Sequence, residues 1–193
     1  MLIGKTALLV IDMQNDFIGQ NSPCPCAGVE AIIPKIKTLI KTCRAASIPV
    51  VYTQEVHRPS LVDIGRERPH HCFIGTPGVE ICPELAPAAE DPVVTKPRYD
   101  AFLDTDLPHV LHGYNVRAND TLIICGVATN ICVHYTASGA FQRDFHVRVV
   151  GDCCAGYNEK LHQGALDNIA VLEKNSLVDL AEILSAITAY GRQ

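Results

Sequence analysis

The stretch TLIICGVATNICVHYTA, residues 121–137, is the clearest indication of the fold class. Its first five residues are almost entirely apolar, as in a strand that is covered on both faces of a parallel sheet. Gly126 follows the apolar run, and a helical pattern begins near Asn130. A strand that passes through a short turn into a helix is the repeating unit of α/β proteins. Cys132 stands at the start of that helix, where it could be a core residue, a metal ligand or a nucleophile.

The same alternation of strand and helix runs through the rest of the chain. Four further strands are predicted, at residues 7–11, 49–53, 92–95 and 147–150. Apolar residues recur at helical spacing over 29–43 and again over 177–189. The order of these elements predicts a three-layer α/β/α sandwich with a central, mostly parallel sheet. In such folds, ligands bind at the carboxyl ends of the strands.

Length and composition predict one folding unit. The chain has 193 residues, of which 48% are hydrophobic, and a chain of this size can bury a core of its own. We therefore expect residues 1–193 to form a single domain. Residues 54–91 contain prolines and glycines with little periodicity, so we expect them to form a loop that shapes the site over a rigid sheet.

Charge and hydropathy exclude several classes of partner. The chain carries 16 basic and 21 acidic residues, with a formal net charge of -5, and its basic residues do not cluster as they do in proteins that bind phosphate backbones. No apolar stretch approaches the roughly 20 residues that span a bilayer. We expect no nucleic-acid or membrane partner, a cytoplasmic location, and nine reduced cysteines.

Three polar residues follow three of the predicted strands. Asp12 ends the first strand, Lys96 ends the third, and Cys132 follows the fourth after the glycine turn. Because parallel strands end at the same edge of a sheet, the three side chains should converge. A nucleophilic thiol needs a nearby cation or a helix N-terminus, and a carboxylate can serve it as general base and then general acid. Each residue taken alone could equally be a cap, a surface charge or core packing.

The contexts of these residues carry a resemblance to a known family. The segments LLVIDMQNDF, TKPRYDAF and GVATNICV resemble the three signature segments of the isochorismatase-like cysteine hydrolases, which include nicotinamidases, N-carbamoylsarcosine amidase, ureidoacrylate amidohydrolase and biuret hydrolase. The resemblance covers roughly residues 5–172. It implies an isochorismatase-like hydrolase fold, with Asp12, Lys96 and Cys132 as the catalytic residues. Such a protein would be a cysteine-dependent amidohydrolase.

The resemblance also implies features of the turn and of the assembly. The peptide between Val127 and Ala128 would be cis, and the N–H groups of Ala128 and Cys132 would form an oxyanion hole. No organic cofactor is implied. Relatives are often dimers or tetramers, so a homo-oligomer is expected.

The loop after the second strand points to a substrate class. The segments EVHRPSLVDIGRE and IGTPGVEI look like the corresponding loop of the carbamoyl and ureido amide hydrolases. Their substrates are small, planar and polar, and often bear a carboxylate that a guanidinium group can bind. The candidate substrate contacts are Asn15, Phe17, Arg58, Arg66, Arg98, Tyr99 and Val127.

Three alternative functions remain open at this stage. Nicotinamidases of the family hold a metal through an Asp-x-His pair and a later histidine, whereas this chain has Glu55 and His57, followed by His70 or His71. Because the pattern differs, we expect no bound metal, although a metal-bound nicotinamidase is one alternative. The second is an isochorismatase-type vinyl-ether hydrolase, which needs no cysteine nucleophile. The third is a non-catalytic α/β binding module, for which a glycine-rich loop should follow the first strand.

Overall fold

The central element of the protein is a six-stranded sheet. The computed structural model describes residues 2–58 and 70–191. Neighbouring strands are all parallel, in the order β3-β2-β1-β4-β5-β6. The strands are β1 (Thr6–Ile11), β2 (Val50–Glu55), β3 (Val93–Lys96), β4 (Thr121–Val127), β5 (His146–Ala155) and β6 (Leu177–Val178). The predicted parallel sheet is therefore confirmed.

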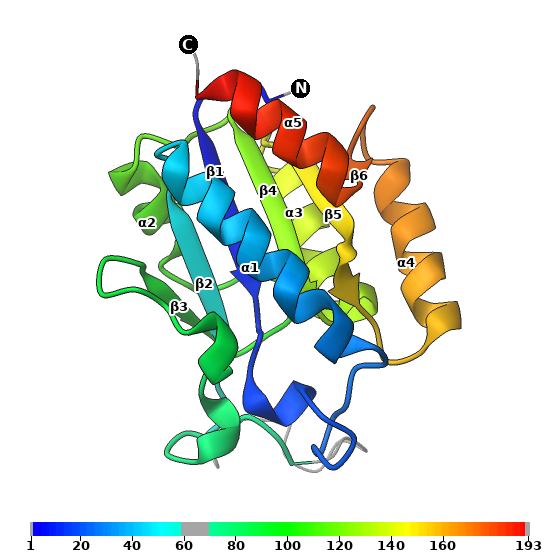
Figure 1. Ribbon diagram of the computed structural model, residues 1–193. Coiled ribbons are helices and arrows are strands. Elements are labelled where there is room, and N and C mark those ends of the chain that lie inside the picture. The colour runs from blue at the N-terminus through cyan, green and yellow to red at the C-terminus, as the bar shows by residue number, and fades with distance from the viewer. Residues whose placement is uncertain (1, 59–69, 192–193) are drawn as a thin grey trace.

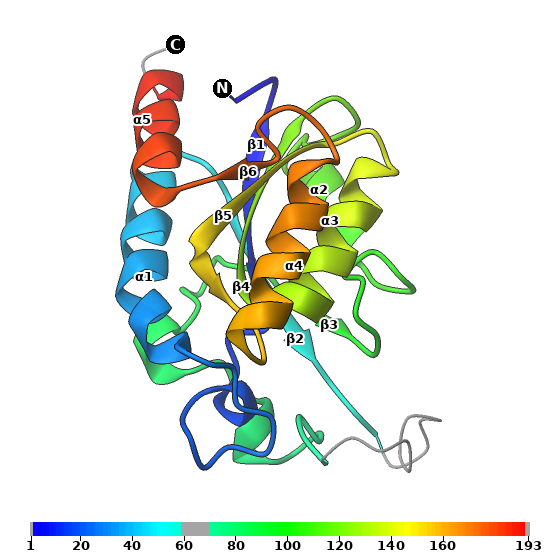
Figure 2. The ribbon, with the colours of Figure 1, turned by 90° about the vertical axis from the view of Figure 1, so that its right-hand side faces the viewer.

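Helices cover both faces of this sheet. Within the described residues they are α1 (Val29–Ala45), α2 (Leu107–Gly113), α3 (His134–Phe141), α4 (Glu159–Ala170) and α5 (Leu180–Tyr190). Helices α1 and α5 lie on one face, and α2, α3 and α4 lie on the other (Figures 1 and 2). The predicted three-layer α/β/α sandwich is thus confirmed. Short helical turns are η1 (Asn15–Phe17), η2 (Pro77–Val79), η3 (Pro83–Leu85) and the π-helical η4 (Thr129–Val133).

The two middle strands form the buried centre of the fold. Every residue of β1 and β4 is buried, which explains their nearly continuous apolar sequences. Their register pairs Thr6 with Thr121 at one end and Ile11 with Gly126 at the other. The residues that follow these two strands therefore emerge at the same edge of the sheet.

Gly126 occupies a position that excludes a side chain. Its φ of +115° lies in the region that L residues rarely adopt, and a Cβ there would lie 2.1 Å from the carbonyl oxygen of Ile11. The pairing of β4 with β5 shifts between Ile124 and Gly126. The close approach of β1 and β4 thus depends on glycine at this point.

Two predictions about the C-terminal half need correction. The predicted helix over 177–189 begins too early, because Leu177 and Val178 form the edge strand β6 beside β5. The helix begins at Leu180, where Asp179 and Glu182 form a reciprocal capping box. Strand β5 also continues to Ala155, beyond the predicted end at residue 150, so Cys153 and Cys154 lie inside a strand. No described helix is both long and apolar enough to cross a membrane.

Candidate active site

The structure brings the three strand-end residues together. The Lys96 Nζ atom lies 2.7 Å from Asp12 Oδ2 and 3.2 Å from Cys132 Sγ. Asp12 follows β1, Lys96 ends β3, and Cys132 lies in the η4 turn after β4. Their exposed fractions are 0%, 1% and 4%. The ammonium group therefore bridges a carboxylate and a sulfur in an environment largely shielded from water.

Lys96 is a permanent cation in this environment. Burial alone would lower its pKa, but the negative charges of Asp12 and Glu55 raise the pKa above the ordinary lysine value. Its Nζ atom also donates a hydrogen bond of 3.0 Å to the carbonyl oxygen of Arg98. The lysine is therefore suited to holding negative charge, and not to accepting a proton.

Asp12 has a raised pKa, and its environment explains why. Complete burial raises the pKa, the positive charge of Lys96 lowers it, and the nearby Glu55 raises it again. The Thr53 hydroxyl donates a 2.6 Å hydrogen bond to Asp12 Oδ1, which favours the ionised form. A carboxyl group poised in this way can both accept and return a proton.

The Cys132 thiol differs from the expectation drawn from sequence. Lys96 lowers its pKa, as expected, but burial has the larger effect, and Asp12 and Glu55 add to it. The net pKa is well above the ordinary cysteine value, so the resting group is a thiol. A carboxylate oxygen of Asp12, a carboxylate oxygen of Glu55 and the Sγ atom of Cys132 all lie within 4.8 Å of one another. The thiol therefore has a proton acceptor beside it.

The turn that carries Cys132 is held by side chains on neighbouring elements. The peptide between Val127 and Ala128 is cis. Thr129 Oγ1 lies 2.8 Å from His162 Nδ1 on α4, and Asn130 Oδ1 accepts a 3.1 Å hydrogen bond from the Tyr157 N–H. Thr129 and Asn130 thus support the turn.

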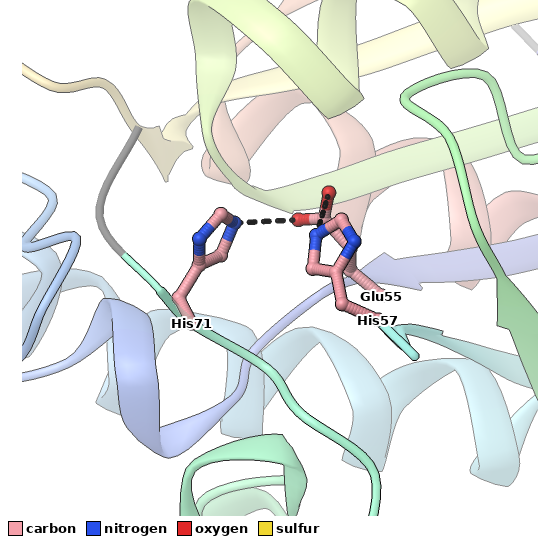
Figure 3. A group of neighbouring side chains, drawn as sticks. All are labelled: Glu55, His57 and His71. Atoms are coloured by element: carbon pink, nitrogen blue, oxygen red, sulfur yellow. Dashed lines mark hydrogen bonds and ion pairs between the residues drawn. The ribbon is translucent and has the colours of Figure 1, made fainter. Parts of the chain in front are cut away.

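A second polar cluster adjoins the first. Glu55 ends β2, and its carboxylate lies 3.1 Å from His57 Nε2 and 3.6 Å from His71 Nε2 (Figure 3). All three side chains are buried. Burial opposes the ionised form of Glu55, but the hydrogen bond with His57, the nearby His71 and the charge of Lys96 hold its pKa below the usual glutamate range. Glu55 therefore faces both clusters as an anion.

The donor set of this second cluster suits a metal ion. One carboxylate and two imidazoles offer ligand atoms that lie within 4.8 Å of one another, and zinc binds such nitrogen and oxygen donors. Among the described residues, the buried Nδ1 atom of His57 has no hydrogen-bond partner. His70 is exposed and packs on Phe73, so His71 is the histidine that joins the cluster. The residues present therefore fit a metal, although the departure from the Asp-x-His pattern had led us to expect none.

The predicted substrate contacts lie in different places. Phe17 is buried and packs edge-on against the His71 ring, with centroids 5.6 Å apart. Asn15 Nδ2 donates a hydrogen bond to the Pro77 carbonyl oxygen, and this contact ties η1 to η2. Val127 is fully buried at the end of β4.

Arg98 and Tyr99, which follow Lys96, make contacts with neighbouring residues. Arg98 Nη1 donates to the carbonyl oxygen of the preceding Pro97, and the ring of Tyr99 packs near that of Tyr135. Arg66 lies outside the described residues.

Arg58 lines a cavity beside the active site. The cavity has a volume of about 520 Å³, and its described lining includes Lys96 and Arg58 but neither Asp12 nor Cys132.

Sequence analysis missed two residues that shape the site. Thr53 contacts the Asp12 carboxylate. Gln14 is completely buried, and its side-chain amide bonds to the backbone N–H and carbonyl groups of Glu55. Gln14 thereby joins the chain after β1 to the end of β2. Its position two residues after Asp12 placed it near the predicted site. Its partner Glu55 is 41 residues away in the chain, however, so the contact could not be predicted from sequence.

Comparisons with known proteins agree with this geometry. A family model described as the isochorismatase domain matches residues 6–182. The chain is 37% identical over 170 residues to nicotinamidase 3 of Arabidopsis thaliana, covering 85% of this chain and 80% of that protein. It is 30% identical over 191 residues to the ureidoacrylate amidohydrolase RutB of Serratia proteamaculans (strain 568), covering 86% and 76% respectively. The crystal structure of an isochorismatase-like hydrolase from Alkaliphilus metalliredigens matches with a TM-score of 0.88 at 34% identity, over 95% of this chain and 99% of that one.

Proposed function

Because this chain belongs to the isochorismatase family of hydrolases, we propose that it is a cysteine-dependent amidohydrolase that cleaves a C–N bond of a small amide, carbamoyl or ureido compound. The observation that carries the proposal is the buried contact of Lys96 with both Asp12 and Cys132. Two similar proteins are named as a nicotinamidase and a ureidoacrylate amidohydrolase, and both names describe amide chemistry.

The first half of the reaction forms a covalent intermediate. Asp12 takes the proton of the Cys132 thiol, and the resulting thiolate attacks the carbonyl carbon of the amide. Lys96 stays protonated and stabilises the sulfur and the aspartate. The N–H groups of Ala128 and Cys132 would donate hydrogen bonds to the carbonyl oxygen as negative charge develops on it.

The second half of the reaction returns the enzyme to its starting state. Asp12 gives its proton to the leaving nitrogen, the C–N bond breaks, and ammonia or an amine departs from a thioester on Cys132. A water molecule then attacks the thioester while Asp12 accepts a proton from it. The acid product leaves, and the proton returns to the sulfur.

A metal-containing amidase is the second candidate, and the buried Glu55, His57 and His71 cluster favours it. These three residues would hold a divalent ion such as zinc, which acts as a Lewis acid when bound. A carboxylate oxygen of Glu55 also lies within 4.8 Å of a carboxylate oxygen of Asp12 and of the Cys132 Sγ atom, so the cluster adjoins the nucleophile. This candidate differs from a metal-free carbamoyl or ureido hydrolase in its cofactor and not in its nucleophile.

Two other readings of the site have less support. A vinyl-ether hydrolase has no use for a sulfur beside a charged lysine. A non-catalytic binding module would not need to bury an ammonium, a carboxylate and a thiol in mutual contact, since such burial costs free energy. An oligomeric assembly, a single domain over 1–193 and a cytoplasmic location stay predictions.

Ammonia release from a panel of compounds tests the proposal. The panel holds nicotinamide, an N-carbamoyl amino acid and a ureido acid, each assayed with metal-stripped and zinc-loaded protein. We expect turnover of at least one compound, and a loss of at least about 10⁴-fold in Cys132→Ala because the nucleophile is gone. Cys43→Ala, which also removes a buried thiol, serves as the matched control and should keep its activity. Equal turnover by Cys132→Ala would overturn the proposal.

A further inference from the structure

Asp16 connects three separate segments near the active site, although the proposed chemistry does not use it. Its Oδ2 atom accepts a 2.6 Å hydrogen bond from the Cys72 N–H. Its main-chain carbonyl oxygen accepts a 3.2 Å hydrogen bond from the Cys24 N–H. A Cβ on Gly78 would lie 2.2 Å from the Asp16 carboxylate, so glycine at that position makes room for the carboxylate.

Cys72 is the residue next to His71, and its backbone is unusual. Its φ of +51° lies in the left-handed region, which residues other than glycine seldom occupy. The N–H of Cys72 is held by Asp16, and its carbonyl oxygen accepts a 2.9 Å hydrogen bond from the His57 N–H. Both sides of this residue are therefore fixed, and the direction in which His71 leaves the chain is fixed with them.

The ring of His71 is held from the same turn. Phe17 follows Asp16 in η1, and its ring packs edge-on against the His71 ring at 5.6 Å between centroids. Two consecutive residues thus hold the backbone beside His71 and the imidazole itself. His71 in turn lies 3.6 Å from Glu55 and belongs to the group of three potential ligands.

We propose that Asp16 is a positioning residue that holds His71 in place for metal binding by Glu55, His57 and His71. It acts through the Cys72 backbone and not through contact with the nucleophile. An ionised acceptor makes a shorter and stronger hydrogen bond than a neutral one, which suits the 2.6 Å contact. The inference rests on the metal-containing form of the proposed function.

Metal titration of the full chain tests this inference. Metal-stripped protein is titrated with zinc chloride by calorimetry, and with cobalt(II) chloride by absorption. The cobalt spectrum distinguishes nitrogen and oxygen ligands from thiolates, a necessary check because the described chain carries nine free cysteines. We expect Asp16→Asn, which keeps the shape but removes the charge, to weaken zinc binding by about 10- to 100-fold. Asp167→Asn, an exposed change on α4, should leave the affinity as in the wild type.

Two further variants separate positioning from a general loss of structure. Gly78→Ala places a methyl group against the Asp16 carboxylate and should weaken zinc binding in the same way, which also covers the case in which Asp16→Asn does not fold. Cys72→Gly relieves the left-handed backbone, so adding it to Asp16→Asn should recover part of the lost affinity. If Asp16 only stabilises the fold, Asp16→Asn should melt at a lower temperature, and adding Cys72→Gly should not restore its zinc affinity.

The outcomes are separable from those of the amidase assay. Wild-type zinc affinity in both Asp16→Asn and Gly78→Ala would overturn the inference. So would a zinc affinity that Glu55→Gln does not reduce, because the ion would then not be bound at this cluster. The titration requires no turnover, and Cys132→Ala should bind zinc as the wild type does. A protein that binds zinc at this cluster but releases no ammonia would defeat the amidase proposal alone.

Discussion

The two halves of the site are built in different ways. Asp12, Lys96 and Cys132 lie at, or a few residues after, the ends of parallel strands, and the register of the sheet brings them together. His57 and His71 lie beyond the end of β2 and depend on contacts with η1 and with each other. Strand ends are held by the whole core, whereas the loop histidines are held by a few local bonds. We therefore expect the loop half to tolerate change and to vary in function more readily than the strand half.

Glu55 stands at the boundary between the halves. It is the last residue of β2 and pairs in register with Lys96 of β3, so it shares the fixed geometry of the strands. Its carboxylate nevertheless contacts both loop histidines. The single carboxylate is thus the link through which the metal-binding candidate residues and the nucleophile can influence each other.

The largest effect should come from breaking the strand half at Lys96. Lys96→Met keeps the stem but removes the charge, which leaves Asp12 and Glu55 buried without their cation. We expect a loss of about 3–5 kcal/mol in the free energy of unfolding, and a fall in kcat/KM of roughly 10³-fold or more. Urea unfolding and ammonia release measure the two effects. Lys160→Met, an exposed change on α4, is the control, and near-normal kcat/KM in Lys96→Met would show that the cation is dispensable.

A smaller effect should come from removing the Thr53 hydroxyl, which donates a hydrogen bond to Asp12. The Thr53 hydroxyl bond to Asp12 lowers the pKa of that carboxyl, so Thr53→Val should raise it. Asp12 must be ionised to accept the thiol proton, and activity should therefore rise with pH through the Asp12 pKa, which lies above 3.8. We expect the acid limb of kcat/KM to move up by roughly one pH unit. Thr38→Val on α1 should not move the limb, and a downward shift in Thr53→Val would identify a different titrating group.

The smallest effect on activity should come from the opposite edge of the sheet. Glu173 Oε1 lies 3.1 Å from Arg148 Nη1 and accepts a 2.6 Å hydrogen bond from the Val147 N–H, while Oε2 lies 3.0 Å from His146 Nδ1. Glu173→Gln should leave kcat/KM unchanged but lower the free energy of unfolding by about 1–3 kcal/mol at neutral pH. A large loss of activity would mean that the two edges of the sheet are coupled.

The pH dependence of this variant has a defined sign. Burial opposes ionisation of Glu173, but His146, Val147 and Arg148 lower its pKa below the reference value of 4.5. A group with a depressed folded-state pKa stabilises the fold fully above its unfolded-state pKa, and that contribution is lost as pH falls through the folded-state value. The difference in unfolding free energy between wild type and Glu173→Gln should therefore persist above pH 4.5 and narrow below it, as measured by urea unfolding at several pH values.

The same contrast explains what could be predicted from sequence. Continuous apolar runs identify β1 and β4 because both faces of these strands are buried, and the strand-end rule then brings Asp12, Lys96 and Cys132 together. The two-residue strand β6 is too short to produce a pattern. Spacing identifies Glu55 and His57, with His70 or His71, as a candidate metal group, but the tertiary contacts show that they are buried together and that His71 is the histidine that joins them. The raised pKa of the Cys132 thiol could not be predicted from sequence, because it depends on a burial that outweighs the neighbouring cation.

Gly126 has a consequence for how this enzyme can change. A methyl group there would collide with the backbone of Ile11, whose next neighbour along the chain is Asp12. Any larger residue would wedge the two central strands apart and draw the acid away from the sulfur, although it would touch neither group. Saturation mutagenesis selected for catalysis should thus return a single amino acid at this position, whereas selection for folding alone should also return variants in which the two strands have shifted apart.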